Sequence, residues 1–286
     1  MTNPIIALTG SSGFVGSSLA RHLTNQGFKI VCLARTISEQ YQHRPYNMEH
    51  PLTDNLLLGV DLLIHCAFIK LEENPNAQSI NYEGTKNLIS AAKKCGVQKI
   101  IFFSTVSAHY QAISSYGKGK FQTEQLFDDS DVILQCSLII GDGGLFKQIL
   151  NHTLSTRLVP LPNNGNQPMQ VIVIDDVLKS VVSIINNKLC GRFILANTER
   201  FTYKEFFKVI SKVYRKTLFY VPMPISFLKV IAGMAGIAKL KLPFNKENIY
   251  SLQTLKELDS FTSIAQLGLQ PMSLEEKLKD LKASMS

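Results

Sequence analysis

The stretch that decides the fold lies at the start of the chain: Pro4-Ile5-Ile6-Ala7-Leu8-Thr9-Gly10-Ser11-Ser12-Gly13-Phe14-Val15-Gly16. Its apolar first half predicts a buried strand, and Leu19, Ala20 and Leu23 after it predict a helix. The G-x-x-G-x-x-G turn between them lets backbone N–H groups approach a phosphate beside the partial positive charge of a helix N-terminus. The strand and helix on either side distinguish it from a surface turn, and no lysine follows Gly16 as in a Walker-type loop. We therefore predict a site for the pyrophosphate of a dinucleotide.

Bulk composition narrows the class of protein. The 286 residues are 45% hydrophobic, which suits one large α/β unit or a nucleotide domain with a modest appendix. The net charge of +8 is scattered and no aromatic–basic module is present, so a small-molecule substrate is favoured and nucleic acid is not. The five cysteines form no C-x-x-C pair, so neither a disulfide framework nor a metal site is expected. A first strand that begins at once leaves no room for a signal peptide, which predicts a cytoplasmic location.

The segment 224–243 is the part of the chain that hints at a membrane. Lys229, Lys239 and Lys241 interrupt its apolar residues, so its uncharged run falls short of the ~20 residues of a span. We predict an amphipathic helix packed over the substrate cleft, with membrane-surface contact as the less favoured alternative. The sequence is compatible with a homodimer and does not decide the oligomeric state.

Short apolar runs alternate with helical patterns over most of the chain. Runs that are apolar on both faces and separated by helices indicate a parallel sheet covered on both sides, an α/β doubly wound (Rossmann) fold. The polar stretch 43–51 predicts only a short substitute for a third strand. The expected strands cover residues 5–9, 28–33, 61–67, 99–104, 132–140, 170–174 and 192–196, with helices near 14–26, 79–95, 114–127 and 145–155.

The rhythm changes after Gly141-Asp142-Gly143-Gly144. A proline- and asparagine-rich loop follows, then a strand and a helix that Asp175 or Asp176 is expected to cap. We predict a dinucleotide-binding domain and a smaller, mainly helical substrate domain interleaved with it. The first covers residues 1–145 plus 170–197, and the second covers residues 146–169 plus 198–286.

The end of the second strand bears on the choice of cofactor. An acidic residue there would accept the ribose 2′-OH of NAD, whereas an arginine suits the 2′-phosphate of NADP. The strand ends Leu33-Ala34-Arg35, with alanine at the acidic position and Arg35 just beyond it. This pattern favours NADP(H) over NAD(H).

Tyr116 and Lys120 are the acid–base candidates. Their i, i+4 spacing puts a phenol and an ammonium on one helix face, where the cation is expected to favour the phenolate and to hold the nicotinamide ribose. Tyr82 and Lys86 share the spacing but precede the fourth clear strand, whereas Tyr116 follows it. That strand ends in Ser104-Thr105, hydroxyls able to polarise a carbonyl.

Six motifs together resemble the extended short-chain dehydrogenases/reductases, the NAD-dependent epimerase/dehydratase family. The resemblance covers most of residues 4–197 and is specific as an ensemble. In chain order the motifs are Gly10-x-x-Gly13-x-x-Gly16, Asp61-Leu-Leu-Ile-His65-Cys-Ala67, Asn81-Tyr-Glu-Gly84-Thr85-Lys-Asn87-Leu88, Ser104-Thr105, Tyr116-x-x-x-Lys120 and Leu134-Gln-Cys-Ser-Leu-Ile-Ile-Gly141.

The resemblance implies a role for each matched position. Thr105 (or Ser104), Tyr116 and Lys120 would be the catalytic set, while His65 would be a buried structural ring and Asn81 would fix backbone. The residues expected to contact the cofactor are Gly10, Ser12, Gly13, Phe14, Val15 and Gly16 at the pyrophosphate, Arg35 at the 2′-phosphate, Cys66 and Ala67 at the adenosine, and Ser137 to Ile140 at the nicotinamide.

Departures from the family pattern bear on the substrate. Val106-Ser107 replaces the Asp-Glu pair of the dehydratases, and the segment from Thr105 to Tyr116 is short. Gln135 and the run Pro168-Met169-Gln170-Val171 stand where nucleotide-sugar enzymes carry arginines. These changes resemble the atypical branch, which includes relatives of the NADPH-binding accessory subunit of respiratory complex I.

The sequence thus predicts an NADP-preferring oxidoreductase or epimerase that transfers hydride at a hydroxyl or keto carbon, with a nucleotide sugar or related keto-sugar as substrate. The alternative is a scaffold or redox sensor that binds NADPH without catalysis.

Overall fold

The computed structural model describes residues 3–284 except 37–38, 72–73, 229–245 and 255–256. Most of the helix expected over 224–243 therefore lies outside the described residues. The described elements are β1 (Ile5–Thr9), α1 (Phe14–Asn25), β2 (Lys29–Ala34), β3 (Gln42–Pro45), β4 (Leu62–His65), α2 (Ala77–Lys94), β5 (Lys99–Thr105), α3 (Ser115–Glu124), β6 (Val132–Cys136), β7 (Leu138–Ile140), α4 (Gly144–Thr156), β8 (Leu158–Pro162), η1 (Asn163–Gly165), β9 (Pro168–Met169), β10 (Val171–Val173), α5 (Ile174–Asn186), β11 (Gly191–Leu195), β12 (Phe201–Thr202), α6 (Tyr203–Tyr214), β13 (Phe219–Met223), α8 (Lys246–Thr254), α9 (Phe261–Gln266) and α10 (Leu274–Ala283).

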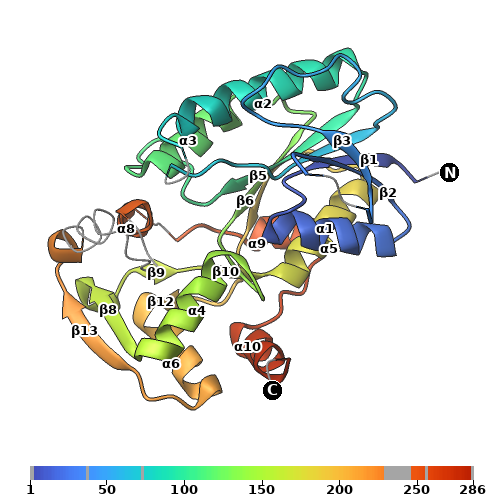
Figure 1. Ribbon diagram of the computed structural model, residues 1–286. Helices are drawn as coiled ribbons and strands as arrows, with labels where there is room; N and C mark the ends of the chain where they lie inside the picture. Colours follow the sequence, from blue (N-terminus) through green and yellow to red (C-terminus); the bar gives the residue numbers. More distant parts are fainter. Residues whose placement is uncertain (1–2, 37–38, 72–73, 229–245, 255–256, 285–286) are drawn as a thin grey trace.

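Seven strands of the described chain form one parallel sheet in the order β11-β6-β5-β4-β1-β2-β3. The chain builds outward from β1 to β3 and then crosses back to β4 before continuing to β11, which is the doubly wound order. Figure 1 shows α2 and α3 on one side of the sheet and α1 and α5 on the other. The predicted Rossmann fold is confirmed, and β3 is the short strand expected at the polar stretch.

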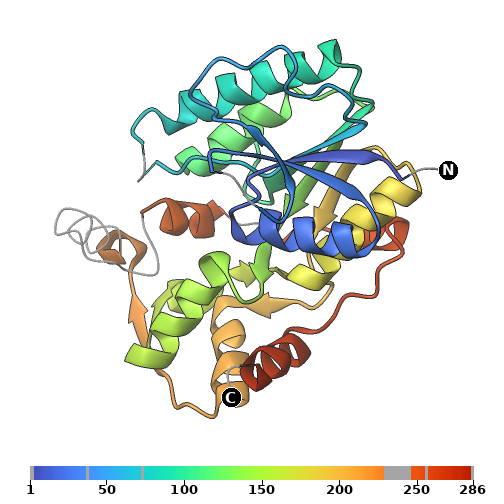
Figure 2. The ribbon, with the colours of Figure 1, turned by 45° about the vertical axis from the view of Figure 1, so that its right-hand side comes forward.

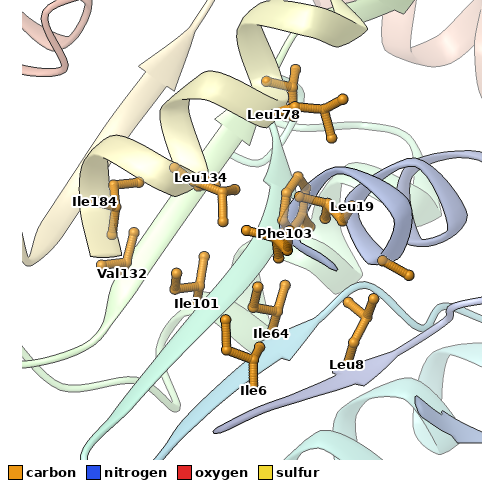
Figure 3. Close-up of a cluster of buried hydrophobic side chains, with 14 of the residues drawn as sticks. Ile6, Leu8, Leu19, Ile64, Ile101, Phe103, Val132, Leu134, Leu178 and Ile184 are labelled. Carbon is orange, nitrogen blue, oxygen red and sulfur yellow. The ribbon is translucent and has the colours of Figure 1, made fainter. Parts of the chain in front are cut away.

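Apolar side chains fill both faces of this sheet because successive strand residues point to opposite sides. On β5, Ile100 packs under the α2 face with Leu63 and Leu88, whereas Ile101 packs on the α1 and α5 face. Each such buried side chain contributes roughly 1.5–3 kcal/mol. Figure 3 shows the second of these clusters, with Ile6, Leu8, Leu19, Ile64, Ile101, Phe103, Val132, Leu134, Leu178 and Ile184 labelled.

A further core lies in the C-terminal part, below the sheet in Figure 2. It joins Phe146 of α4, Phe206 of α6 and Leu278 of α10, beside the two-stranded pairs β8–β13, β9–β12 and β7–β10. Val171, which the sequence assigns to the first domain, belongs to this core as well. The two-domain division stays a prediction.

Two local expectations need correction. Val173, not an aspartate, is the N-cap of α5, and Asp175 and Asp176 lie in its first turn. They bind the C-terminal segment instead: Asp175 pairs with Lys277, and an oxygen of Asp176 accepts the amide of Met272 at 2.9 Å.

The strand expected over residues 132–140 is interrupted at Ser137, where the pairing changes from β11, opposite Cys136, to β10, opposite Leu138. Over the residues that the structure covers, none of the helices combines the length and the apolar character needed to cross a membrane.

Candidate active site

The glycine turn between β1 and α1 is tightly packed. Gly10 has φ +70°, and a Cβ there would lie 2.8 Å from the amide nitrogen of Ala67. A Cβ on Gly16 would lie 2.1 Å from the Gly10 carbonyl oxygen. The helix begins at Phe14 with Gly13 as N-cap, with neither a side-chain cap nor an acidic residue in its first turn. Its N–H groups and partial positive charge therefore suit an anion, which fits the predicted pyrophosphate site.

A buried hydrogen-bond chain supports the turn from below. The Thr85 hydroxyl donates to the carbonyl of Asn81 at 2.6 Å, so His65 Nε2 donates to Thr85 at 3.0 Å and carries the ring proton. His65 Nδ1 then accepts from the Thr9 hydroxyl at 2.7 Å. Burial lowers the pKa of His65 to about 3, with Lys120 adding to the effect, so the ring is neutral. His65 is buried and hydrogen-bonded on both ring nitrogens, to the Thr9 and Thr85 side chains.

The segment after β4 is fixed next to the turn. Thr9 Oγ1 accepts the amides of Cys66 and Ala67, each at 3.1 Å. Asn81 grips Ile69 through both backbone groups, at 2.8 Å and 2.7 Å, so it fixes backbone as predicted. Cys66 and Ala67 thus lie beside Gly10, where the family resemblance puts the adenosine.

Arg35 follows the end of β2, the neighbour of β1 in the sheet, and its side chain is exposed. It therefore lies at the same carboxyl edge of the sheet as the glycine turn. A cation at this edge is available to a phosphate on the adenosine ribose.

Tyr116 and Thr105 meet where α3 approaches the end of β5. The Thr105 side chain lies near the Tyr116 phenol, and Thr105 Oγ1 accepts the amide of Ser107 at 3.2 Å. Burial, together with nearby Cys136, raises the pKa of Tyr116 to about 12, and the Thr105 hydroxyl opposes that rise. The phenol is thus protonated at neutral pH. The expectation that Lys120 would favour the phenolate is not met here.

Lys120 explains that difference, because its ammonium turns toward the sheet. Nζ donates to the carbonyl of Phe103 at 2.6 Å and lies 4.9 Å and 4.5 Å from the ring centroids of Phe68 and Phe102. Burial lowers the pKa of Lys120 to about 8, and Cys66, Glu124 and Cys136 oppose that shift. The group is therefore a buried cation poised to titrate just above neutral pH.

The side chains of three predicted site residues are engaged within the protein. The Ser104 hydroxyl donates to Glu124, so Thr105 is the hydroxyl next to the phenol. The Ser137 hydroxyl donates to the carbonyl of Leu195 at 3.0 Å. Ile140 has no exposed surface and packs in the C-terminal core, so it presents nothing to a ligand here, whereas Leu138 and Ile139 stay half-buried.

Sequence reasoning missed three residues around this site. Glu124 continues the Tyr116 and Lys120 spacing by four residues, a signal that was there to be read. The Phe68 ring packs edge-on against Tyr116, with centroids 5.1 Å apart. Glu247 of α8 accepts the amide of Tyr116 at 3.0 Å, and no local pattern connects residues so distant in the chain.

The chain belongs to the NAD-dependent epimerase/dehydratase family, whose model matches residues 6–194. Among curated relatives, UDP-glucuronic acid decarboxylase 1 of Arabidopsis thaliana is 23% identical over 252 residues, covering 73% of this chain and 58% of the relative. The Mycobacterium bovis protein Mb2073c is 28% identical over 144 residues, or 48% of this chain. The match spans only 15% of the length of that relative.

Solved structures share the fold along the whole chain. The crystal structure of gox2253 has a TM-score of 0.77 at 21% identity, covering 98% of this chain and 97% of that one. MoeE5 in complex with UDP-glucose and NAD has a TM-score of 0.73 at 16% identity, covering 98% and 99%. Both are similar in fold alone.

Proposed function

We propose that this protein is an NAD(P)-dependent oxidoreductase or epimerase that transfers hydride at a hydroxyl or keto carbon. One arrangement carries the proposal: Tyr116 and Lys120 lie four residues apart on α3, and Thr105 at the end of β5 lies near the phenol. All three residues stand at the carboxyl edge of a sheet whose first turn suits a pyrophosphate. Ligands of open α/β sheets bind at this edge.

The protonation state assigns a direction to Tyr116. The nicotinamide supplies or accepts the hydride when it is bound. A phenol whose pKa is near 12 is protonated at neutral pH, so Tyr116 would donate its proton to the substrate oxygen as a carbonyl is reduced. Thr105 would orient that oxygen, while the Lys120 ammonium, bound to the carbonyl of Phe103, would hold α3 against β5. We therefore favour reduction over epimerisation.

NADP(H) is the cofactor that we propose for this chain. Arg35 supports the choice, because it is exposed beyond β2 and no acidic side chain stands at the preceding position. MoeE5, which shares the fold, is described in complex with NAD. The proposed preference for NADP(H) therefore rests on Arg35.

For the substrate we propose a nucleotide sugar or a related keto-sugar. The decarboxylase relative and the MoeE5 complex, both named for UDP-sugars, support this class. The Gln170 side chain makes two hydrogen bonds to the backbone of Leu258, at 2.8 Å and 3.0 Å. It is therefore not available to bind a substrate diphosphate, which argues against tight binding of that group. Dehydration is not proposed, since Val106-Ser107 offers no acid or base to move water.

Phe68 favours a second candidate, an NADPH-binding scaffold or redox sensor without catalysis. Its ring touches the Tyr116 ring and lies under the Lys120 ammonium, so the protein's own side chains pack around both groups. A site filled in this way suits binding without turnover.

A deuterium-transfer assay separates the two candidates. The purified protein is incubated with NADPH deuterated at the nicotinamide C4 position and a panel of nucleotide sugars and keto-sugars, and products are analysed by mass spectrometry. Deuterium in a product supports the oxidoreductase. Tight NADPH binding without label in any product supports the scaffold.

A further inference from the structure

Glu124 is a buried carboxylate that ties the catalytic helix to three strands. Its side chain is fully buried at the last turn of α3, four residues after Lys120. It accepts the Ser104 hydroxyl from β5, pairs with Arg192 from β11, and accepts Gln135 Nε2 from β6 at 3.0 Å and 3.2 Å. One carboxylate thus fixes four elements relative to one another.

The strand register explains why these partners meet. Ser104 lies opposite Gln135, and Arg192 lies opposite Ile133, two residues before Gln135. Residues that pair across parallel strands share a face with those two positions away. Ser104, Gln135 and Arg192 therefore all point to the face that α3 covers.

Charge explains why Arg192 is required. An ionised carboxylate removed from water needs a cation and hydrogen bonds to be tolerated. Gln135 is neutral and supplies hydrogen bonds only, so the positive charge comes from Arg192, whose side chain is 42% exposed at the sheet edge. Gln135 is held in turn by the carbonyl of Ala108, at 3.2 Å from its Nε2.

The cluster of Glu124, Arg192, Gln135 and Ser104 adjoins the reacting groups on two sides. Ser104 directly precedes Thr105 on β5, while Tyr116, Lys120 and Glu124 follow one another at four-residue intervals on α3. A shift of α3 along β5 would move the phenol away from the Thr105 hydroxyl.

We propose that Glu124 is a positioning residue, anchored by Arg192, that sets the register of the catalytic helix against β5 and supplies the negative charge facing Lys120. The inference rests on the proposed function for its kinetic consequence but not for its electrostatic one. The other titratable groups that face the Lys120 ammonium are Cys66 and His65 at the end of β4 and Cys136 at the end of β6.

The first test compares Glu124→Gln, which keeps the shape and removes the charge, with Asp131→Asn. Asp131 is also buried and accepts the amide of Ile100 at 2.9 Å, but it precedes β6 at the opposite edge of the sheet. We expect kcat to fall ~10–100-fold in Glu124→Gln with little change in NADPH Kd, because small misplacements of reacting groups cost that much. Asp131→Asn should lose thermal stability and keep kcat. An unchanged kcat in Glu124→Gln would overturn the positioning role.

The second test needs no substrate. NMR of protein labelled at the lysine Cε carbons, with Lys120 assigned by comparison with Lys120→Arg, follows the protonation of Lys120 directly. Since Glu124 holds the pKa of Lys120 up, the midpoint should move to lower pH in Glu124→Gln and stay near pH 8 in Asp131→Asn. An unmoved midpoint in Glu124→Gln would contradict the electrostatic part.

A charge relocation keeps the proposal testable if Glu124→Gln does not fold. Arg192→Gln should lower kcat as Glu124→Gln does, and adding Gln135→Arg should recover most of the loss by returning the cation from the next strand. No recovery in a folded double variant would show that the pair does not act through charge. Failure of the proposed function can be told apart from failure of this inference. If the proposed function is wrong, Tyr116→Phe keeps full turnover, while the NMR titration of Lys120 still shows whether Glu124 acts on it.

Discussion

The two halves of the carboxyl edge of the sheet use their polar groups in opposite ways. Around β1, β2 and β4, the turn at Gly10 and the uncapped start of α1 leave backbone N–H groups and the Arg35 side chain directed outward. Near β6 and β11, and beside the separate strand β10, polar side chains bind within the protein: Gln135 binds Glu124, Gln170 binds Leu258, and Asp176 binds Met272.

The two halves are built from different parts of the chain: backbone forms the first half, and side chains form the second. A dinucleotide site made of backbone shape persists as long as the glycines do. The substrate half is made of side chains, and here several of them hold the protein together. The half around the glycine turn therefore depends on the glycines, while the other half depends on side-chain contacts within this chain.

The largest expected effect comes from breaking the cofactor half at its turn. Gly10→Ala should abolish NADPH binding, because its Cβ would lie 2.8 Å and 2.9 Å from backbone atoms of Ala67 and Cys66. Gly268→Ala is the matched control, since Gly268 has a similar φ of +64° with nothing within 4 Å of its Cβ. We expect Gly10→Ala to lose roughly 1–3 kcal/mol more stability than the control, measured by urea unfolding. Equal losses would contradict the packing argument.

Removing the hydroxyl beside the phenol should come next. Thr105→Val keeps the shape of the side chain and removes the hydroxyl near Tyr116, so we expect turnover to fall ~10²–10³-fold, as for other groups that bind the reacting oxygen. Ser104→Ala, whose hydroxyl faces Glu124, should cost less. Steady-state kinetics of both variants settle the order, and a larger loss for Ser104→Ala would reverse the assignment.

Replacing Arg35 tests the predicted preference for NADPH over NADH. Arg35→Ala should weaken NADPH binding about 10–100-fold, because a charge-assisted hydrogen bond contributes ~1.5–3 kcal/mol. NADH affinity, measured in the same fluorescence titration, is the internal control and should hardly change. Parallel losses for both nucleotides would show that Arg35 does not contact a 2′-phosphate.

The smallest effect is the pH dependence set by Lys120. Its charged form is present below its pKa of about 8 and is lost as the pH rises through that value, so kcat/KM should fall above about pH 8. Arginine stays charged over this range, so Lys120→Arg should flatten the alkaline limb of whatever activity it keeps. A wild-type profile without an alkaline limb would argue against a role for the Lys120 charge.

Local spacing made the fold and most of the cofactor half predictable. Glycine spacing, apolar runs and the i, i+4 pair of Tyr116 and Lys120 are patterns within a few residues of one another. The rest depends on partners far apart in the chain. Arg192 reaches Glu124 across 68 positions, and Glu247 reaches the amide of Tyr116 across 131.

The orientation of two predicted hydroxyls depends on such distant partners as well. Ser104 and Ser137 both carry hydroxyls at strand ends near the site, and only tertiary contacts show that Glu124 and Leu195 occupy them. Likewise, the Lys120 ammonium was expected to act on the phenol, and only the fold shows it bound to the carbonyl of Phe103. Type and spacing locate such groups, but they do not orient them.

The central claim is that Tyr116 is the acid of a working hydride-transfer site on this dinucleotide fold. The most direct measurement compares Tyr116→Phe with the wild type in NADPH binding and in NADPH oxidation with the best substrate of the panel. We predict near-normal NADPH affinity and no detectable turnover, because the substitution removes only the phenolic hydroxyl that would donate the proton. Unchanged turnover in Tyr116→Phe would contradict it.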